Sequence, residues 1–252
     1  MTDSQPRGFE FISLGITCPM ANEKDSALSF VQDVLKTCSD YGFKEQRFYA
    51  TLDRVCTDGT LEILKEAQAD LPDLEVVWAP ENRCVVDAYL RGYKTALANR
   101  HDWILEIDAG YSHRPEDIPK FFDKMAEGYE CVFASRYRQG GRMTNIHPVN
   151  YVISRFGTFL ANALLGTRLS DMTSGFELFS AKALNDILAQ GLISKTSFFQ
   201  TELKAHAHRF RIAEVGILYK PTPSRVRAAE ITESLKSLLA LKTKLSQSNK
   251  GE

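Results

Sequence analysis

The chain has 252 residues, of which 44% are hydrophobic and 25% are charged. This length supports one large α/β core, so we expect one main domain with a C-terminal appendage. The 31 basic and 32 acidic residues give a formal net charge of −1, which excludes the bulk positive field of a general nucleic-acid-binding protein. Five scattered cysteines without a CxxC pair argue against a disulfide framework and a zinc site, and favour a reducing, cytoplasmic setting.

The N-terminal stretch MTDSQPRGFE is polar, and no apolar run reaches the length of a bilayer. We therefore predict neither a signal peptide nor a spanning helix, and expect any membrane contact to be peripheral.

Apolar runs alternate with segments of helical spacing along the first half of the chain. Strands are predicted at 11–17, 47–53, 74–78 and 103–108, and helices at 27–38, 60–68 (with Thr60 as its cap) and 85–99. This alternation implies right-handed crossovers and a mainly parallel sheet.

The second half continues the pattern with strands at 130–134 and 211–219 and helices at 149–165, 181–190, 198–208 and 231–245. The last helix is amphipathic, with Ile231, Leu235, Leu238 and Leu245 on one face. Packing of this face on the domain or on a second subunit is one interpretation, and docking on a membrane surface is the other.

The strand at 103–108 ends in Asp108, and ligands of open α/β sheets bind at the carboxyl ends of strands. The alternative is that Asp108 only caps a helix starting near 113–117. Other loops present further carboxylates, and later loops present arginines; carboxylates suit a base, ribose or divalent cation, and arginines suit phosphate. The pattern favours a nucleoside-diphosphate site without a Walker loop, GxGxxG or GxSxG. A solvated turn is the alternative for the basic loop 135–142.

Five short segments occur in order along the chain: P-M-A-N-E at 19–23, D-R-V-C-T-D-G-T at 53–60, D-A-G-Y-S-H-R-P at 108–115, S-R-Y at 135–137 and D-M-T-S-G-F at 171–176. In this order they resemble the motifs of family-2 glycosyltransferases with the GT-A fold, and within them the short polyprenol- or dolichol-phosphate mannosyltransferases that lack membrane spans. The segment 19–23 is similar to the family's P-x-x-N-E loop and 53–60 to its D-D-x-S-x-D-G-T turn. Residues 108–115 resemble D-A-D-x-x-H-P-P, 135–137 resemble G-S-R-Y, and 171–176 resemble D-x-T-S-G-F.

The resemblance implies a Rossmann-like, three-layer GT-A sandwich over 1–220, followed by an acceptor loop and the amphipathic helix over 221–252. It further implies inverting transfer of a hexose from a nucleoside-diphosphate sugar, with GDP-mannose as the expected donor, to polyprenol or dolichol phosphate. Two alternatives stay open: transfer to a hydroxyl of a soluble compound or glycan, and a non-catalytic family member that binds a nucleotide.

The resemblance also implies roles for individual residues. Donor binding is expected from Pro19, Asn22, Glu23, Asp53, Arg54, Asp58, Asp108, Ala109 and Gly110. Catalysis is expected from Asp108, Arg136, Arg155 and Asp171, where Asp171 is the proton acceptor for a hydroxyl acceptor or, alternatively, the cap of its turn. Acceptor binding is expected from Ser135, Arg136, Ser174, Lys220, Ser224 and Arg225.

Three positions depart from the family pattern, two of them at the expected metal site and the third, Arg54, at the expected contact to the nucleotide base. Gly110 stands where the family has the second acid of D-x-D, Ser112 where many members have glutamine, and Arg54 where they have a second acid. We therefore expect Mg or Mn binding at Asp108 to be weakened or lost, with arginines taking over charge neutralisation. The expected partners are a nucleoside-diphosphate sugar, a lipid-phosphate or hydroxyl acceptor, the cytosolic face of a membrane, and a second copy or a small membrane subunit, but no nucleic acid.

Overall fold

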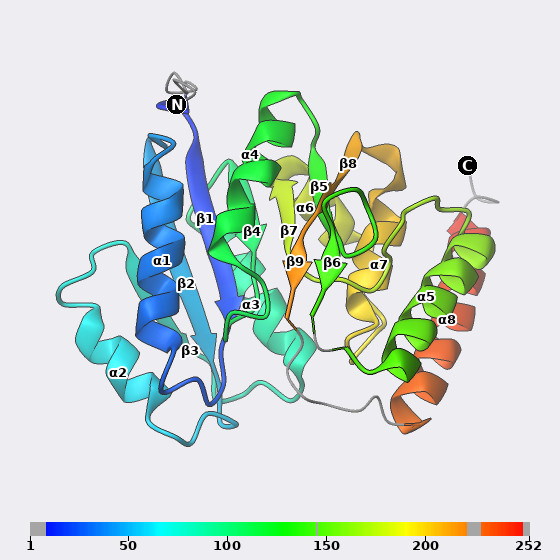
Figure 1. Ribbon diagram of the computed structural model, residues 1–252, viewed down its shortest axis with the longest axis horizontal. Helices are drawn as coiled ribbons and strands as arrows, with labels where there is room; N and C mark the ends of the chain where they lie inside the picture. The colour runs from blue at the N-terminus through cyan, green and yellow to red at the C-terminus, as the bar shows by residue number, and fades with distance from the viewer. Residues whose placement is uncertain (1–8, 145, 221–227, 249–252) are drawn as a thin grey trace.

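The computed structural model describes residues 9–144, 146–220 and 228–248 (Figure 1). Its main sheet has seven strands in the order β3-β2-β1-β4-β7-β5-β8. These strands are β1 (Ser13–Pro19), β2 (Glu45–Leu52), β3 (Leu74–Trp78), β4 (Trp103–Glu106), β5 (Cys131–Ser135), β7 (Glu177–Ser180) and β8 (Ile212–Gly216). All pairs are parallel except those of β7, which runs antiparallel to β4 and β5. A separate parallel pair is formed by β6 (Arg142–Met143) and β9 (Leu218–Tyr219).

Helices cover both faces of the sheet and make a three-layer sandwich (Figure 1). One face carries α1 (Ala27–Ser39), α2 (Thr60–Ala67) and α4 (Ile118–Ala126), and the other carries α3 (Val85–Ala98), α6 (Ala181–Ala189) and α7 (Phe199–His206). Two 3₁₀ turns lie at Pro115–Asp117 and Ala207–Arg209. The predicted α/β fold with a mainly parallel sheet is confirmed.

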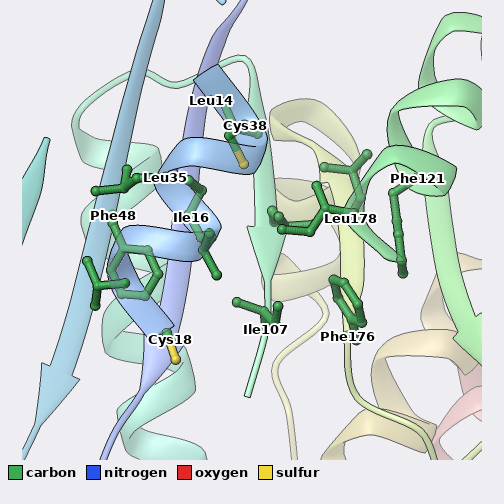
Figure 2. Close-up of a cluster of buried hydrophobic side chains, with 14 of the residues drawn as sticks. Leu14, Ile16, Cys18, Leu35, Cys38, Phe48, Ile107, Phe121, Phe176 and Leu178 are labelled. Atoms are coloured by element: carbon green, nitrogen blue, oxygen red, sulfur yellow. The ribbon is translucent and has the colours of Figure 1, made fainter. Parts of the chain in front are cut away.

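Alternating residues of β1 point to opposite faces of the sheet. Leu14, Ile16 and Cys18 are fully buried on the face that α1 and α4 cover (Figure 2). Gly15 faces α3, where a Cβ would lie only 2.9 Å from the Cβ of Ala96. The residue-by-residue alternation of strands thus places small residues where α3 approaches β1 closely.

The predicted strand at 211–219 is divided into β8 and β9. At the break, a Cβ on Gly216 would lie 2.3 Å from the carbonyl oxygen of Gln139. The chain therefore needs glycine there, because the loop after β5 crosses directly over it. β7 was not predicted as a strand.

The two longest helices, α5 (Pro148–Leu165) and α8 (Ala228–Ser248), pack against each other beside the sheet (Figure 1). Leu238 and Leu241 of α8 are buried with Ala161 of α5. The face predicted from the sequence was partly wrong, because Leu235 is 43% exposed while Leu241 takes its place in the core. None of the described helices combines the length and apolarity needed to cross a bilayer.

Candidate active site

The loops after β1 and β2 are tied together at the carboxyl edge of the sheet. Asn22 donates from Nδ2 to the carbonyl of Val55 at 3.0 Å and accepts from the backbone N–H of Thr57 at 2.9 Å. Its φ of 58° lies in the left-handed region, which asparagine tolerates better than most residues. Asn22 thus positions the predicted donor loop, in which Pro19 closes β1.

Two predicted donor carboxylates organise the loop after β2. Asp58 accepts from the N–H and hydroxyl of Thr60 at 3.0 and 2.6 Å, and from the N–H of Lys24 at 2.9 Å. The Thr60 hydroxyl contributes most to lowering the pKa of Asp58. Thr60 is the first residue of α2 and not its cap as predicted; the N-cap is Gly59, and the Asp58 carboxylate beside it accepts from the Thr60 N–H. Asp53 accepts from the N–H of Val55 at 2.9 Å, which forms an Asx turn and leaves Arg54 exposed beside it.

Asp108 follows β4 and is held by two aromatic side chains. The hydroxyl of Tyr89 donates to Oδ1 of Asp108, and the backbone N–H of Asp108 donates to Nδ1 of His113 at 3.3 Å. Burial lowers the pKa of His113, so the imidazole is neutral and its 3.5 Å approach to Oδ2 is not an ion pair. Asp108 is 33% exposed and caps no helix, since the 3₁₀ turn at Pro115 has no side-chain cap.

Glu23 lies against the glycine that replaces the family's second acid. A Cβ on Gly110 would lie 2.9 Å from each carboxylate oxygen of Glu23. Glu23 and Asp108 therefore flank the loop formed by Ala109 and Gly110. Both carboxylates also raise the pKa of the buried Cys18 thiol, after burial itself.

This donor set fits a magnesium or manganese ion. Such ions are commonly held by one or two carboxylates together with substrate phosphates. Glu23 from the loop after β1 and Asp108 from the loop after β4 supply two carboxylates, although the described residues contain no group of three or more metal-binding side chains.

Arg136 and Asp171 form a buried, two-pronged ion pair. Nε and Nη2 of Arg136 each donate to an Asp171 oxygen at 2.7 Å, and the backbone N–H of Arg136 donates at 3.1 Å. Asp171 is 0% exposed and the Arg136 side chain 10%. Burial opposes ionisation of Asp171, but the guanidinium prevails and holds its pKa below the usual range.

The structure argues against Asp171 as the proton acceptor that the sequence predicted. Both of its oxygens are occupied by Arg136, the side chain is fully buried, and its low pKa makes it a weak base. The hydrogen bonds fit its alternative role as the cap of its turn better, because Asp171 also accepts from the N–H of Thr173 at 3.2 Å. The pair fixes the loop after β5 to the loop before β7.

The predicted acceptor serines have structural contacts. The Ser135 hydroxyl is fully buried, lies 2.7 Å from the Ser170 hydroxyl and accepts from the N–H of Tyr137 at 3.1 Å. Ser135 therefore shapes the basic loop and is closed to an acceptor. Ser174 lines a cavity, although only 4% of it is exposed and its hydroxyl donates to the carbonyl of Gly175.

The last predicted acceptor segment is described only at its start. Lys220 is exposed, and its backbone N–H donates to the carbonyl of Ser112 at 3.0 Å. Ser224 and Arg225 lie outside the described residues.

A cavity of about 190 Å³ lies between the two halves of the site. Asp108 and Tyr89 contribute one wall, Arg136 and Tyr219 another, and Gln200 lies with them. Residues that lie far apart in the sequence therefore meet in one pocket with both polar and apolar walls.

A fully buried polar network stands behind this cavity. Glu106 accepts from Gln200, and burial followed by the nearby Glu177 raises its pKa, so its neutral form is favoured. Burial raises the pKa of Glu177 to about 7, and Lys204 opposes that rise. The Lys204 ammonium donates to Glu177 and to the carbonyl of Ser174. Lys204 thus ties the cavity wall to the interior.

A second depression of about 410 Å³ lies on the other side of Arg136. The described residues that line it include Arg136, Arg142 and Arg155 and no carboxylate. The Arg155 guanidinium stacks over the ring of Tyr137 at 4.6 Å and is exposed. This basic depression can receive an anion, whereas Arg136 is already neutralised by Asp171.

Sequence reasoning missed Tyr89, Gln200, Lys204 and Tyr219. A signal for two of them was present, because Gln200 and Lys204 lie four residues apart on one face of α7. Polar residues on a buried helix face indicate a buried network. No local signal marks Tyr89 or Tyr219, because aromatic residues on a helix or strand are common in cores.

The model of Glycosyl transferase family 2 matches residues 16–188 of this chain. An undecaprenyl-phosphate mannosyltransferase of Micrococcus luteus is 29% identical over 170 residues, which are 67% of this chain and 70% of that protein. A polyprenol monophosphomannose synthase of Mycolicibacterium smegmatis is 27% identical over 207 residues, which are 81% of this chain and 76% of that protein.

Among solved structures, glucosyl-3-phosphoglycerate synthase of Mycobacterium tuberculosis has the same fold. Its complex with Mn²⁺, UDP-glucose and phosphoglyceric acid superposes with a TM-score of 0.65 at 21% identity, covering 92% of this chain and 80% of that one. The family model spans most of this chain and the fold is that of a GT-A enzyme. The chain therefore belongs to Glycosyl transferase family 2 and is a glycosyltransferase.

Proposed function

We propose that this enzyme transfers mannose from GDP-mannose to a polyprenol phosphate with inversion at the anomeric carbon. The observation that carries the proposal is the basic depression beside an exposed apolar helix face. The names of the two relatives, which describe a mannosyltransferase and a phosphomannose synthase for lipid phosphates, support the donor sugar and the acceptor class.

The apolar face belongs to α5, which starts at the rim of the basic depression. Val149, Val152, Phe156 and Phe159 recur at helical spacing and are exposed, with Phe156 at 61% and Phe159 at 68%. Arg155 lies on the same helix and lines the depression. An acceptor phosphate at the arginines would thus place its polyprenyl chain along this face.

A phosphate acceptor also suits the chemistry of the site. An acceptor phosphate oxygen is already anionic, so it attacks the anomeric carbon without a base while the bond from that carbon to the donor diphosphate breaks. A hydroxyl acceptor needs a proton acceptor, and Asp171 is buried in its pair with Arg136. The described geometry therefore favours the lipid phosphate over the hydroxyl alternative.

Charge grows on the departing diphosphate and must be stabilised. A bound Mg or Mn ion supplies that stabilisation as a Lewis acid. Asp108 and Glu23 face the donor side, and Tyr89 holds the Asp108 carboxylate in place. Arg136 is tied to Asp171, so Arg155 and Arg142 are the arginines that meet the acceptor phosphate.

The proposal is tested with radiolabelled GDP-mannose and undecaprenyl phosphate in detergent. Label should move into the organic phase only when both substrates are present, and UDP-glucose should be a poor donor. Label appearing on a soluble hydroxyl acceptor instead would favour the second alternative, and donor binding without any transfer would contradict the proposed reaction.

Peripheral contact with an anionic membrane follows from the same face. The variant Phe156→Ser with Phe159→Ser should lose flotation with vesicles of phosphatidylglycerol, while Phe11→Ser, an exposed phenylalanine outside α5, should float as the wild type does. If the wild type does not float and forms a dimer that these substitutions dissociate, a second copy covers the face. A requirement for a co-expressed small membrane subunit would point to that partner.

A further inference from the structure

We infer that Glu23 supplies the acidic ligand that Gly110 lacks, so that Glu23 and Asp108 together hold a divalent cation on the donor diphosphate. This rests on the proposed function and names the cation site within it. The inference concerns residues in two different loops, those after β1 and β4.

The first step is that Glu23 fills the volume of the missing side chain. A Cβ at position 110 would lie 2.9 Å from both Glu23 oxygens and 3.2 Å from the carboxylate carbon. Such contacts are too close, so an acid at 110 and the present position of Glu23 exclude each other. The space beside Gly110 therefore holds one carboxylate, and Glu23 supplies it.

The second step is that Glu23 is held in this position. Its backbone N–H donates to the Thr60 hydroxyl at 2.8 Å, and its carbonyl accepts from the N–H groups of Ser26 and Ala27. Oε2 accepts from the Ser26 hydroxyl at 3.0 Å, while Oε1 has no hydrogen-bond partner in the described part of the chain. One oxygen orients the carboxylate and the other is available for a ligand.

The third step is electrostatic. Within the described residues neither Glu23 nor Asp108 forms a salt bridge with a lysine or arginine. Two carboxylates without a counter-charge would repel an anionic diphosphate. A divalent cation between the carboxylates and the diphosphate turns this repulsion into attraction, and hard oxygen ligands suit Mg and Mn.

The test measures how tightly Mn²⁺ binds to the protein in the presence of GDP. The readout is the EPR signal of free Mn²⁺, which decreases as the ion binds. Glu23→Gln keeps the shape and removes the charge, and it should weaken Mn²⁺ binding about 10-fold or more. Asp25→Asn removes an exposed acid of the same loop and should change nothing. Glu23→Ala with Gly110→Asp moves the carboxylate back, and it should recover most of the affinity that Glu23→Ala loses.

The exchange is structurally feasible because Gly110 has a φ of 70°, where aspartate is among the better tolerated residues. Circular dichroism verifies that each variant is folded. Unchanged Mn²⁺ affinity in Glu23→Gln overturns the inference, as does a folded exchange variant with no recovery.

GDP binding with chelator, measured by calorimetry, separates the two proposals. If GDP binds and Mn²⁺ does not join the complex, the cation inference is wrong and the proposed function stands. If GDP binds neither with Mn²⁺ nor with chelator, the proposed function itself is wrong, and the inference that rests on it is wrong too.

Discussion

The substitution Asp171→Asn tests whether the Arg136–Asp171 pair is structural. The change keeps the shape of the side chain and removes its charge. It leaves a guanidinium that is 10% exposed next to an amide instead of a carboxylate. The two hydrogen bonds of 2.7 Å from Arg136 lose their charge-assisted acceptor.

Breaking a buried ion pair by removing one partner costs about 3–5 kcal/mol. Arg136 retains hydrogen bonds to the hydroxyls of Ser154 and Thr173, at 2.8 and 2.6 Å, which places the loss near the lower limit. We therefore expect a loss of about 3 kcal/mol, equivalent to roughly 6–12 °C in Tm for a domain of this size.

The assay is urea unfolding at pH 7 followed by circular dichroism. Asp186→Asn is the control, because Asp186 is 41% exposed and pairs with Lys182 at the surface. That variant should lose less than about 1 kcal/mol.

The pH dependence adds a second test of the pair. Because the folded pKa of Asp171 is lowered, the pair stabilises fully above the unfolded pKa of about 3.9 and its contribution is lost as the pH falls through the folded value. The difference in the free energy of unfolding between the wild type and Asp171→Asn should therefore become smaller as the pH falls through that acidic range. A variant as stable as the wild type but unable to transfer sugar would refute the structural role and restore Asp171 as a proton acceptor.

Three further predictions concern the acceptor side, the buried network and pH. Arg155→Ala should raise the KM for polyprenol phosphate about 10-fold, through loss of a charged contact, and leave GDP binding unchanged; Arg211→Ala, which removes an arginine stacked on Tyr129, should leave that KM unchanged. Lys204→Met should lower the free energy of unfolding in urea by about 3–5 kcal/mol, and adding Glu177→Gln should recover part of it; no recovery would contradict the pairing. Since burial lowers the pKa of His113, the unfolded chain takes up the proton first, so stability should fall as the pH drops below about 6.5, and less so in His113→Gln; equal slopes would contradict this.

Local patterns predicted most of the fold because its central strands are short apolar runs followed by amphipathic helices. β1, β2 and β4 and the helices between them needed no long-range information. β7 was missed because it has four residues and runs antiparallel between β4 and β5, and this depends on pairing with strands far along the chain.

The site was predictable as a set of loops but not as a set of contacts. The motifs predicted that Asp108, Arg136 and Asp171 belong to one site. They could not show that both carboxylate oxygens of Asp171 bind Arg136, because the two residues are 35 positions apart in the sequence. Nor could they show that the pair is buried, which is what makes Asp171 unavailable to a substrate. The position of Glu23 over Gly110 likewise follows from how two loops meet, so the sequence showed a missing acid and not its neighbour.

The central claim is sugar transfer to a lipid phosphate, and analysis of the lipid product tests it most directly. Purified enzyme, GDP-mannose labelled with carbon-13 at C1 and undecaprenyl phosphate should give an organic-soluble mannosyl phosphate. NMR should show the β anomer, inverted from the α-linked donor, and Arg155→Ala should form it more slowly at limiting acceptor. A retained α configuration, or label found only in free mannose while the donor is consumed, would contradict the account.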